Sequence, residues 1–336
     1  MSRRGLMKRY RGPISNHFDG WQFYNPVEMG PGIRPVDLLL WLATRKPGPW
    51  RAWIDAAYGP PPPQSVPRGE LRVTFVGHST VLIQMDGMNI LCDPHWSDRA
   101  SPFARLGPRR HRIPGVRFED LPPIHVVLLS HDHYDHMDVP TLRRIAAAWH
   151  PDFIVPLGVR SRLISDGVEG GAEATELDWW QLVAVTSEIR ITGVPARHSS
   201  GRGPFDRNRT LWCGYVIEGP SGTVFFAGDT AYGPHFVDIK RRFAPIGLAF
   251  LPIGSFQPRW FMQAAHMSPS EAIRAHEDLG AEKSIGIHFG TFHLADDAEE
   301  EAVHELQTLV DSAAEPKPDF CTIPAGEGTQ ITQRAE

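Results

Sequence analysis

The sequence has few cysteines, no long apolar run and no excess of positive charge. Only three cysteines, Cys92, Cys213 and Cys321, occur among 336 residues, and they stand far apart. This spacing argues against a disulfide framework and against a metal site built from thiolates. No uninterrupted apolar stretch approaches the ~18 residues of a membrane-spanning helix, and the basic start of the chain lacks the apolar segment of a secretory signal. We therefore expect a cytoplasmic protein.

The charge balance is weakly acidic, with 34 Lys and Arg against 39 Asp and Glu, a net charge of −5. The broad basic field of a nucleic-acid-binding protein is missing, so we expect no nucleic acid among the partners. Apolar residues make up 41% and charged residues 22%, which is typical of a globular protein. The sixteen histidines are the one unusual feature of the composition.

Two regions of the chain differ in their pattern. Residues 1–68 combine four tryptophans with many prolines, among them residues 60–63, and predict an N-terminal extension packed on the body. From residue 69 to 336, short β patterns alternate with helical ones and predict one α/β body of two sheets with helices outside. The expected strands cover residues 72–76, 80–85, 88–92, 124–129, 153–155, 182–185, 189–194, 213–218, 223–227 and 248–251, and the expected helices 139–148, 268–279 and 297–310.

The most informative stretch is residues 130–136, which reads Ser130-His131-Asp132-His133-Tyr134-Asp135-His136 directly after an apolar run. Because successive side chains alternate in direction, His131, His133 and Asp135 can converge on one point while His136 points to a second. Imidazole and carboxylate ligands without thiolate suit Zn²⁺, Mn²⁺ or Fe. The stretch therefore predicts metal binding, against the alternative of a histidine-rich surface loop.

The H-x-H-x-D-H spacing resembles the metal motif of the metallo-β-lactamase superfamily, which implies a four-layer αββα sandwich over residues 69–336. The same resemblance implies further ligands downstream, each just after an apolar run. It assigns one ion to His131, His133 and His198, a second ion to Asp135, His136 and His288, and Asp229 to both. Two divalent ions, Zn²⁺ with Mn²⁺ or Fe as alternatives, would then share a bridging hydroxide as the nucleophile.

Longer strings are similar to the branch of this superfamily that hydrolyses N-acylphosphatidylethanolamine, together with its bacterial relatives. They include Gly77-His78-Ser79-Thr80-Val81, Leu177-Asp178-Trp179-Trp180 and Pro258-Arg259-Trp260-Phe261-Met262, within a match from about residue 17 to 295. The resemblance implies a phosphodiesterase of the phospholipase D type, acting on N-acylphosphatidylethanolamine-like or related diesters. Its substrate would be a lipid or another small molecule, and peripheral contact with a membrane is an accompanying expectation.

Further residues are candidates for catalysis and substrate binding. His266 could donate a proton to the leaving oxygen or bind phosphate, and a surface histidine is the alternative. Asp93 matches the branch position that orients the site, and Asp229 would bridge the ions. The substrate-binding candidates are Phe256, Arg259, Trp260, Phe261, Met262 and His78. The aromatic residues could line an acyl groove or touch a membrane, or simply belong to the core, and His78 could equally be a buried structural imidazole.

Two other functions stay open at this point. A lactonase or carboxyl-ester hydrolase of the L-ascorbate 6-phosphate lactonase type would use the same hydroxide, so the ligands do not separate it from a phosphodiesterase. Cations for a phosphate would distinguish the two, and Arg259, Arg197 and Arg202 are candidates. A binding module without activity is the second alternative, and the seven intact ligands argue against it.

Overall fold

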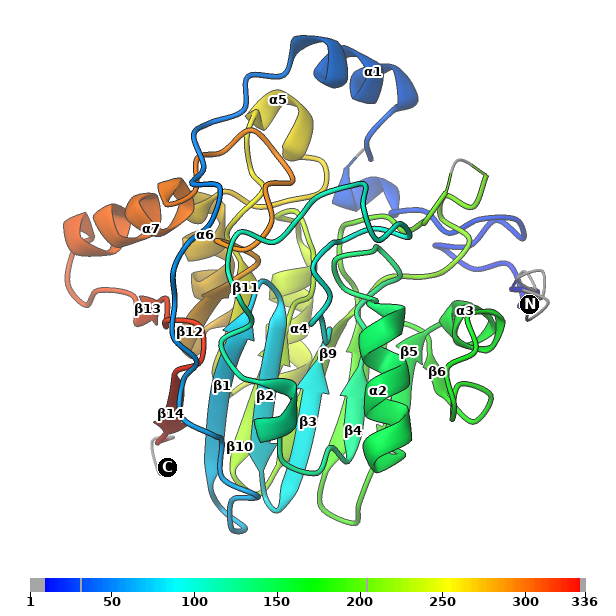
Figure 1. Cartoon of the computed structure of the whole chain (residues 1–336), viewed down its shortest axis with the longest axis vertical. Coiled ribbons are helices and arrows are strands. Elements are labelled where there is room, and N and C mark those ends of the chain that lie inside the picture. Colours follow the sequence, from blue (N-terminus) through cyan, green and yellow to red (C-terminus); the bar gives the residue numbers. More distant parts are fainter. Residues whose placement is uncertain (1–9, 31, 204, 333–336) are drawn as a thin grey trace.

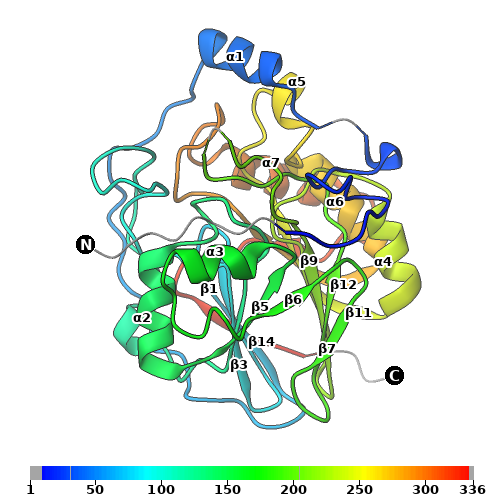
Figure 2. The ribbon, with the colours of Figure 1, turned by 90° about the vertical axis from the view of Figure 1, so that its right-hand side faces the viewer.

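The computed structural model of the protein describes residues 10–30, 32–203 and 205–332. Two seven-stranded sheets pack face to face, and helices cover their outer faces (Figures 1 and 2). The first sheet has the strand order β14-β1-β2-β3-β4-β5-β6, and the second has the order β13-β12-β11-β10-β9-β8-β7. This arrangement confirms the predicted four-layer αββα sandwich.

Both sheets are mixed. The first contains β1 (Leu71–Gly77), β2 (Thr80–Met85), β3 (Met88–Cys92), β4 (Val126–Leu128), β5 (Asp152–Pro156), β6 (Thr175–Leu177) and β14 (Gly328–Ile331). The second contains β7 (Leu182–Ala184), β8 (Arg190–Val194), β9 (Gly214–Gly219), β10 (Gly222–Phe226), β11 (Ile246–Pro252), β12 (Ala281–Ile287) and β13 (Phe320–Cys321). Strands β3 to β6 run parallel, as do β10 to β13, and the remaining pairs are antiparallel.

The helices divide between the two outer faces and the N-terminal region. They are α1 (Pro35–Thr44), α2 (Val139–Trp149), α3 (Val159–Ser165), α4 (His235–Phe243), α5 (Arg259–Met262), α6 (Pro269–Leu279) and α7 (Glu301–Ser312), with 3₁₀ turns at Val27–Met29 and Phe118–Asp120. Helices α2 and α3 lie on the first sheet, and α4, α6 and α7 lie on the second (Figures 1 and 2). Ser268 caps α6 in the predicted capping box with Glu271.

Strict alternation along the strands builds three cores. On β2, Val81 and Ile83 point into the cluster between the sheets, whereas Leu82 points outward to the cluster under α2. A strand buried on both faces needs apolar residues at both parities, which explains why β4 is continuously apolar. The third cluster lies between the second sheet and its helices, so each sheet is covered on both sides.

The predicted strands are present, with their ends shifted by one or two residues. The last helix was predicted four residues too early, because residues 297–300 are engaged elsewhere. The Asp297 carboxylate accepts a hydrogen bond from the Ser255 backbone amide, and Glu299 pairs with Arg51. Strand β12 corresponds to the apolar run expected before His288, whereas helices α1, α3, α4 and α5 and the short strands β6, β13 and β14 were not predicted.

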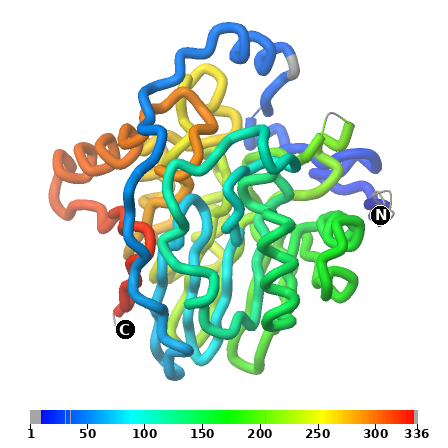
Figure 3. Tube along the Cα trace, viewed as in Figure 1, coloured from blue at the N-terminus to red at the C-terminus, as the bar shows by residue number. Residues whose placement is uncertain are grey.

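The described part of the N-terminal segment, residues 10–68, lies against the body. Phe18 and Phe23 are buried in the core between the sheets, and the Trp41 ring stacks on the Phe261 ring of α5 at 4.9 Å. Beyond α1 the chain runs down one side of the body to the start of β1, as Figure 3 shows, and the Gly59 amide donates to the Gly115 carbonyl on the way. None of the described helices has the length and apolar character required to cross a bilayer.

Candidate metal centre

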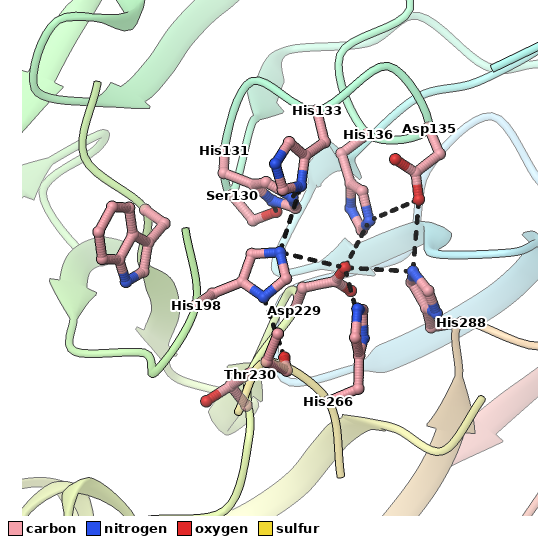
Figure 4. A network of polar contacts seen from close by, with 12 residues as sticks. Ser130, His131, His133, Asp135, His136, His198, Asp229, Thr230, His266 and His288 are labelled. Atoms are coloured by element: carbon pink, nitrogen blue, oxygen red, sulfur yellow. Dashed lines mark hydrogen bonds and ion pairs between the residues drawn. The ribbon is translucent and has the colours of Figure 1, made fainter. Parts of the chain in front are cut away.

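The predicted ligands come from four loops, each of which follows a strand. Residues 131–136 follow β4 in the first sheet, and His198, Asp229 and His288 follow β8, β10 and β12 in the second. Figure 4 shows their side chains gathered around Asp229. The structure brings together all seven: His131, His133, Asp135, His136, His198, Asp229 and His288. Overlapping groups of them have donor atoms within 4.8 Å of one another, a spacing at which they could hold metal ions.

Asp229 lies between two sets of donors. Its Oδ2 atom is 3.2 Å from the Nε2 atoms of both His136 and His288, and 3.6 Å from Nε2 of His198. On one side, Asp135 Oδ2 is 3.3 Å from His136 Nε2 and 3.4 Å from His288 Nε2. The Asp229 carboxylate therefore faces both the ligands predicted for the second ion and the ligands predicted for the first.

The other set consists of imidazoles alone. The Nδ1 atom of His133 lies 2.8 Å from Nε2 of His131 and 3.2 Å from Nε2 of His198. Two neutral imidazoles that face each other through lone pairs repel, and a shared cation removes that repulsion. Three nitrogens in this arrangement match the ligand type and number of a His₃ site.

Hydrogen bonds behind the imidazoles fix their tautomers. Nδ1 of His136 lies 2.7 Å from the Asp93 carboxylate, and Nδ1 of His198 lies 2.9 Å from the carbonyl oxygen of Ala265. Both partners are acceptors here, so Nδ1 carries the proton and Nε2 presents its lone pair to the centre. These contacts orient two ligands and raise their basicity.

Asp93 is linked by hydrogen bonds to a ligand in each donor set, directly to His136 and through Ser130 to His131. It lies directly after β3, fully buried, and also accepts hydrogen bonds from the Ser130 amide at 2.7 Å and the Ser130 hydroxyl at 2.6 Å. Because that hydroxyl gives its proton to Asp93, its oxygen accepts from Nδ1 of His131 at 2.9 Å. These hydrogen bonds are the contacts through which Asp93 would orient the site, as predicted. The sequence analysis did not predict the contribution of Ser130, although this residue directly precedes the metal motif.

Glycine at position 228 allows the Asp229 loop to approach the first sheet. Its backbone φ is +60°, and a Cβ atom there would stand 2.4 Å from Cβ of Ser130. A side chain would therefore push Asp229 away from the histidines that follow β4.

The electrostatics of the cluster fit a cationic group. Burial, helped by neighbouring imidazoles, lowers the pKa of His131 and of His198 well below the usual range, so both present lone pairs. Burial also opposes charge on His288, but Asp229 and Asp135 raise its pKa to about 9. Among the described residues, the buried Nε2 atoms of His136 and His288 and Oδ1 of Asp229 have no hydrogen-bond partner. Imidazole lone pairs and carboxylate charges therefore face one another in this cluster, and a divalent cation would bind both kinds of group.

His266 reaches the same centre from the loop after α5. Its Nδ1 atom lies 3.9 Å from Asp229 Oδ2 and has no hydrogen-bond partner, and burial lowers its pKa to about 4. His78 differs from its predicted place in a substrate-binding wall. It is buried, and its Nε2 atom lies 2.9 Å from Asp135 Oδ2, so it holds a ligand carboxylate instead.

Most of the predicted substrate-binding residues are turned away from solvent. Phe256, Phe261 and Met262 are buried in the cores, which is the alternative that the sequence left open. Arg259 donates to Glu271 at 2.7 Å and to the His266 carbonyl at 3.2 Å, so it stabilises the loop that carries His266. Of this group, Trp260 alone is strongly exposed, at 47%.

A groove of about 660 Å³ lies beside the metal centre, with which it shares His198, and has a wall that sequence patterns did not predict. One side contains His198, Ala265 and Arg207, and the other consists of residues of the N-terminal segment: Gln22, Tyr24, Asn25, Val27, Gly30, Gly32 and Ile33. Asn25 ties the two sides together, because its amide donates to the His198 carbonyl at 2.9 Å. The lining is mixed, with apolar Val27 and Ile33 beside polar groups.

Comparison with known proteins places these features in a family. A profile of the beta-lactamase superfamily domain matches residues 88–289. The chain is 36% identical over 274 residues to the N-acyl-phosphatidylethanolamine-hydrolyzing phospholipase D 1 of Caenorhabditis elegans, covering 79% of this chain and 77% of that protein. It is 41% identical over 257 residues to an uncharacterized protein of Mycobacterium tuberculosis, covering 76% and 67%.

Among solved structures, a metallo hydrolase from the archaeon Ignicoccus hospitalis superposes with a TM-score of 0.58 at 21% identity, covering 79% of this chain and all of that one. That likeness concerns the fold. The profile goes further, because residues 88–289 include the four loops that carry the ligands. The chain belongs to the metallo-β-lactamase superfamily of metal-dependent hydrolases, and its relatives include phospholipases D that hydrolyse N-acylphosphatidylethanolamine.

Proposed function

We propose that this hydrolase is a phosphodiesterase of the phospholipase D type, which acts on N-acylphosphatidylethanolamine-like or related diesters with two divalent ions. The observation that carries the proposal is the position of Asp229 Oδ2 between the two sets of donors. A second support is the 36% identity to a phospholipase D over most of both chains. Zn²⁺ suits the nitrogen and oxygen donors, and Mn²⁺ and Fe suit them as well.

Two ions, when bound, would supply an activated water and offset negative charge on the phosphate oxygens. The first ion would be held by His131, His133 and His198. The second would be held by Asp135, His136 and His288, with Asp229 shared. The chain's own residues then have two further tasks: to hold this geometry, and to move a proton.

Proton transfer falls to His266 in this proposal. Its buried Nδ1 faces Asp229 across 3.9 Å, on the side of the centre that the loop after α5 covers. A leaving alkoxide needs a proton, and because burial keeps this imidazole neutral, it would donate its N–H proton while its other nitrogen takes one from water. Arg259 contributes indirectly, because its guanidinium holds the His266 carbonyl and Glu271.

The groove gives the diester a place to lie. A phosphate at the metal centre would extend one substituent past Val27 and Ile33, between the N-terminal segment and the loop of His198. A mixed lining of this kind accepts a chain that is polar near the phosphate and apolar further out. The N-terminal segment would therefore influence which diesters bind.

The test is hydrolysis by protein reconstituted with Zn²⁺, Mn²⁺ or Fe²⁺ separately. The substrates are a bis-aryl phosphodiester, an aryl ester, a lactone and N-acylphosphatidylethanolamine in detergent. We expect turnover of both diesters, release of N-acylethanolamine, and ¹⁸O from labelled water in the phosphatidate product. Asp229→Asn should abolish this turnover, whereas Asp238→Asn, which alters a half-exposed aspartate on α4, should not. Turnover of the lactone or ester without either diester would contradict the proposal and favour the lactonase alternative.

A further inference from the structure

Three imidazoles are assigned to the first ion, and His133 differs from the other two in how it is supported. Hydrogen-bond acceptors stand behind the rings of His131 and His198, as described above. Among the described residues, the His133 ring has hydrogen-bond contacts with these two imidazoles alone, at 2.8 Å and 3.2 Å (Figure 4). The position of His133 therefore depends on the backbone of its loop.

Arg202, on the loop after β8, holds this backbone. It is one of the cations that the sequence offered for a phosphate, but its Nη1 atom donates instead to the carbonyls of Asp132 at 2.9 Å and Met137 at 2.8 Å. The Asp132 carbonyl belongs to the peptide group that joins this residue to His133. The Arg202 Cζ atom also lies 3.8 Å from the centroid of the Tyr134 ring, whose hydroxyl donates to the Arg202 carbonyl at 3.0 Å. These contacts fix the backbone on both sides of His133.

Two carboxylates join the same two loops. Asp132 is fully buried and accepts hydrogen bonds from the Gly201 amide at 2.7 Å and from Arg162 of α3 at 3.2 Å. Asp206 accepts from the backbone amide of Arg202 at 3.0 Å and from the side chain of Arg162 at 2.6 Å. Charge-assisted hydrogen bonds of this kind are short and directional, so the loop after β8 is held in one position against the metal motif.

We propose that Arg202 is a positioning residue for the first ion: by holding the carbonyls on either side of His133, it sets the separation between His133 and His198. The proposal rests on the two-ion assignment of the proposed function. It explains why an arginine beside the centre is directed to the backbone of the metal motif. Without these contacts, the His133 ring has no partner that would return it to the place where the first ion needs a nitrogen.

The ligands of the second ion have supports of their own. The His136 ring donates to Asp93 at 2.7 Å, and the Asp135 carboxylate lies 2.9 Å from Nε2 of His78. Neither contact involves the loop after β8. Loss of the Arg202 side chain should therefore weaken the first ion and leave the second in place.

The test is binding of Co²⁺ to the metal-free full chain, followed by visible absorption and by chelator competition, neither of which needs hydrolysis. For Arg202→Met, we expect one Co²⁺ to bind as in the wild type and the other about 10- to 100-fold more weakly. Arg202→Lys, which keeps a charged donor, should recover part of this loss. The matched control is Arg143→Met on α2, where the arginine Nε donates to the Asp166 carbonyl at 3.0 Å. It should bind both ions as the wild type does.

Two ligand variants identify which ion is weakened. His131→Ala removes a ligand assigned to the first ion alone, and His288→Ala removes one assigned to the second alone. The Co²⁺ that each retains gives a reference spectrum, since the absorption depends on the ligands. The tightly held Co²⁺ of Arg202→Met should have the spectrum of His131→Ala. The spectrum of His288→Ala, or equal weakening of both ions, would overturn the proposal.

Tyr134→Phe keeps the proposal testable if Arg202→Met does not fold. This variant retains the ring beside the guanidinium and removes one hydrogen bond between the loops, so the first ion should bind about two- to tenfold more weakly. Unchanged affinity in Tyr134→Phe would then overturn the role of Arg202. A wild type that binds a single Co²⁺ would overturn the two-ion assignment and this proposal with it. Two ions without diester hydrolysis would contradict the proposed function alone.

Discussion

The loops that carry the ligands and the N-terminal segment meet at one site but differ in how they are held. Each loop follows a strand of the central sheets, and three of the imidazoles are fixed by hydrogen bonds that they donate to Asp93, Ser130 and the Ala265 carbonyl. The segment contacts the loop of His198 through hydrogen bonds, among them those from Asn25 to the His198 carbonyl and from Arg207 to the Ile33 carbonyl, and its turn at Val27–Met29 ends in the wall of a groove.

This difference separates two tasks. Chemistry at a metal centre requires donors fixed to within a fraction of an ångström, which buried networks on a sheet provide. Choice of substrate requires a surface that can vary without disturbing the donors. We infer that the body determines the reaction and the segment influences which diester reaches it, and each of the following variants is designed to break that separation.

The largest effect is expected from Asp229→Asn. A neutral carboxamide offers one weak oxygen donor where the carboxylate faced His136, His198 and His288, so one ion or both should be lost. We expect kcat/KM on a bis-aryl diester to fall by about a thousandfold or more, with metal content measured by plasma mass spectrometry on the same sample. Full metal content with full turnover would show that Asp229 is dispensable and that the centre works otherwise.

Asp93→Asn should have the next largest effect, without touching a donor directly. Asparagine has one acceptor oxygen for the three hydrogen bonds that Ser130 and His136 now donate, so the imidazole is held less firmly and becomes a poorer ligand. We expect metal affinity to fall by roughly 10- to 100-fold in chelator competition. Asp98→Asn, at an exposed aspartate near Arg109, is the control and should leave the chelator curve unchanged.

His266→Gln should lower kcat by about 10- to 100-fold while both ions stay bound. The residue is not among the seven predicted ligands. Its predicted task is to donate a proton, and the glutamine amide cannot give one up at any relevant pH. A leaving group that needs no proton, such as nitrophenolate, should reduce the loss relative to an alkyl leaving group. Equal losses for both leaving groups would indicate a structural role, and a loss of metal would place His266 among the ligands.

The metal ligands could be predicted from the sequence, whereas the contacts of the N-terminal segment could not. His131, His133, Asp135 and His136 stand within six residues, so the chain itself places them together after β4. His198, Asp229 and His288 have no such local pattern, and only the family resemblance connected them. The central strands were as predictable as the local metal motif, because a strand buried on both faces must be largely apolar at both parities.

The N-terminal segment has no comparable signal. Its contacts with the body join residues far apart in the chain, such as Trp41 with Phe261 and Asn25 with His198, and no periodicity records them. Helix α1 was missed because leucines on nearly every side give it no amphipathic period. The buried state of Phe256, Phe261 and Met262 was likewise undecided, since an aromatic cluster has the same composition in a core and in a binding site.

The smallest effect, and the most direct test of the separation, is expected from Asn25→Ala. The change removes one hydrogen bond of about 0.5–1.5 kcal/mol between the segment and the His198 loop, which corresponds to roughly a two- to tenfold rise in KM. Long-chain diesters, which fill the groove, should show this rise, while a bis-aryl diester and the metal content stay unchanged. Asn16→Ala, at an exposed asparagine of the same segment, is the control. If Asn25→Ala lowered metal content or kcat on the short diester, the segment would belong to the metal centre itself, and the two tasks would not be separate.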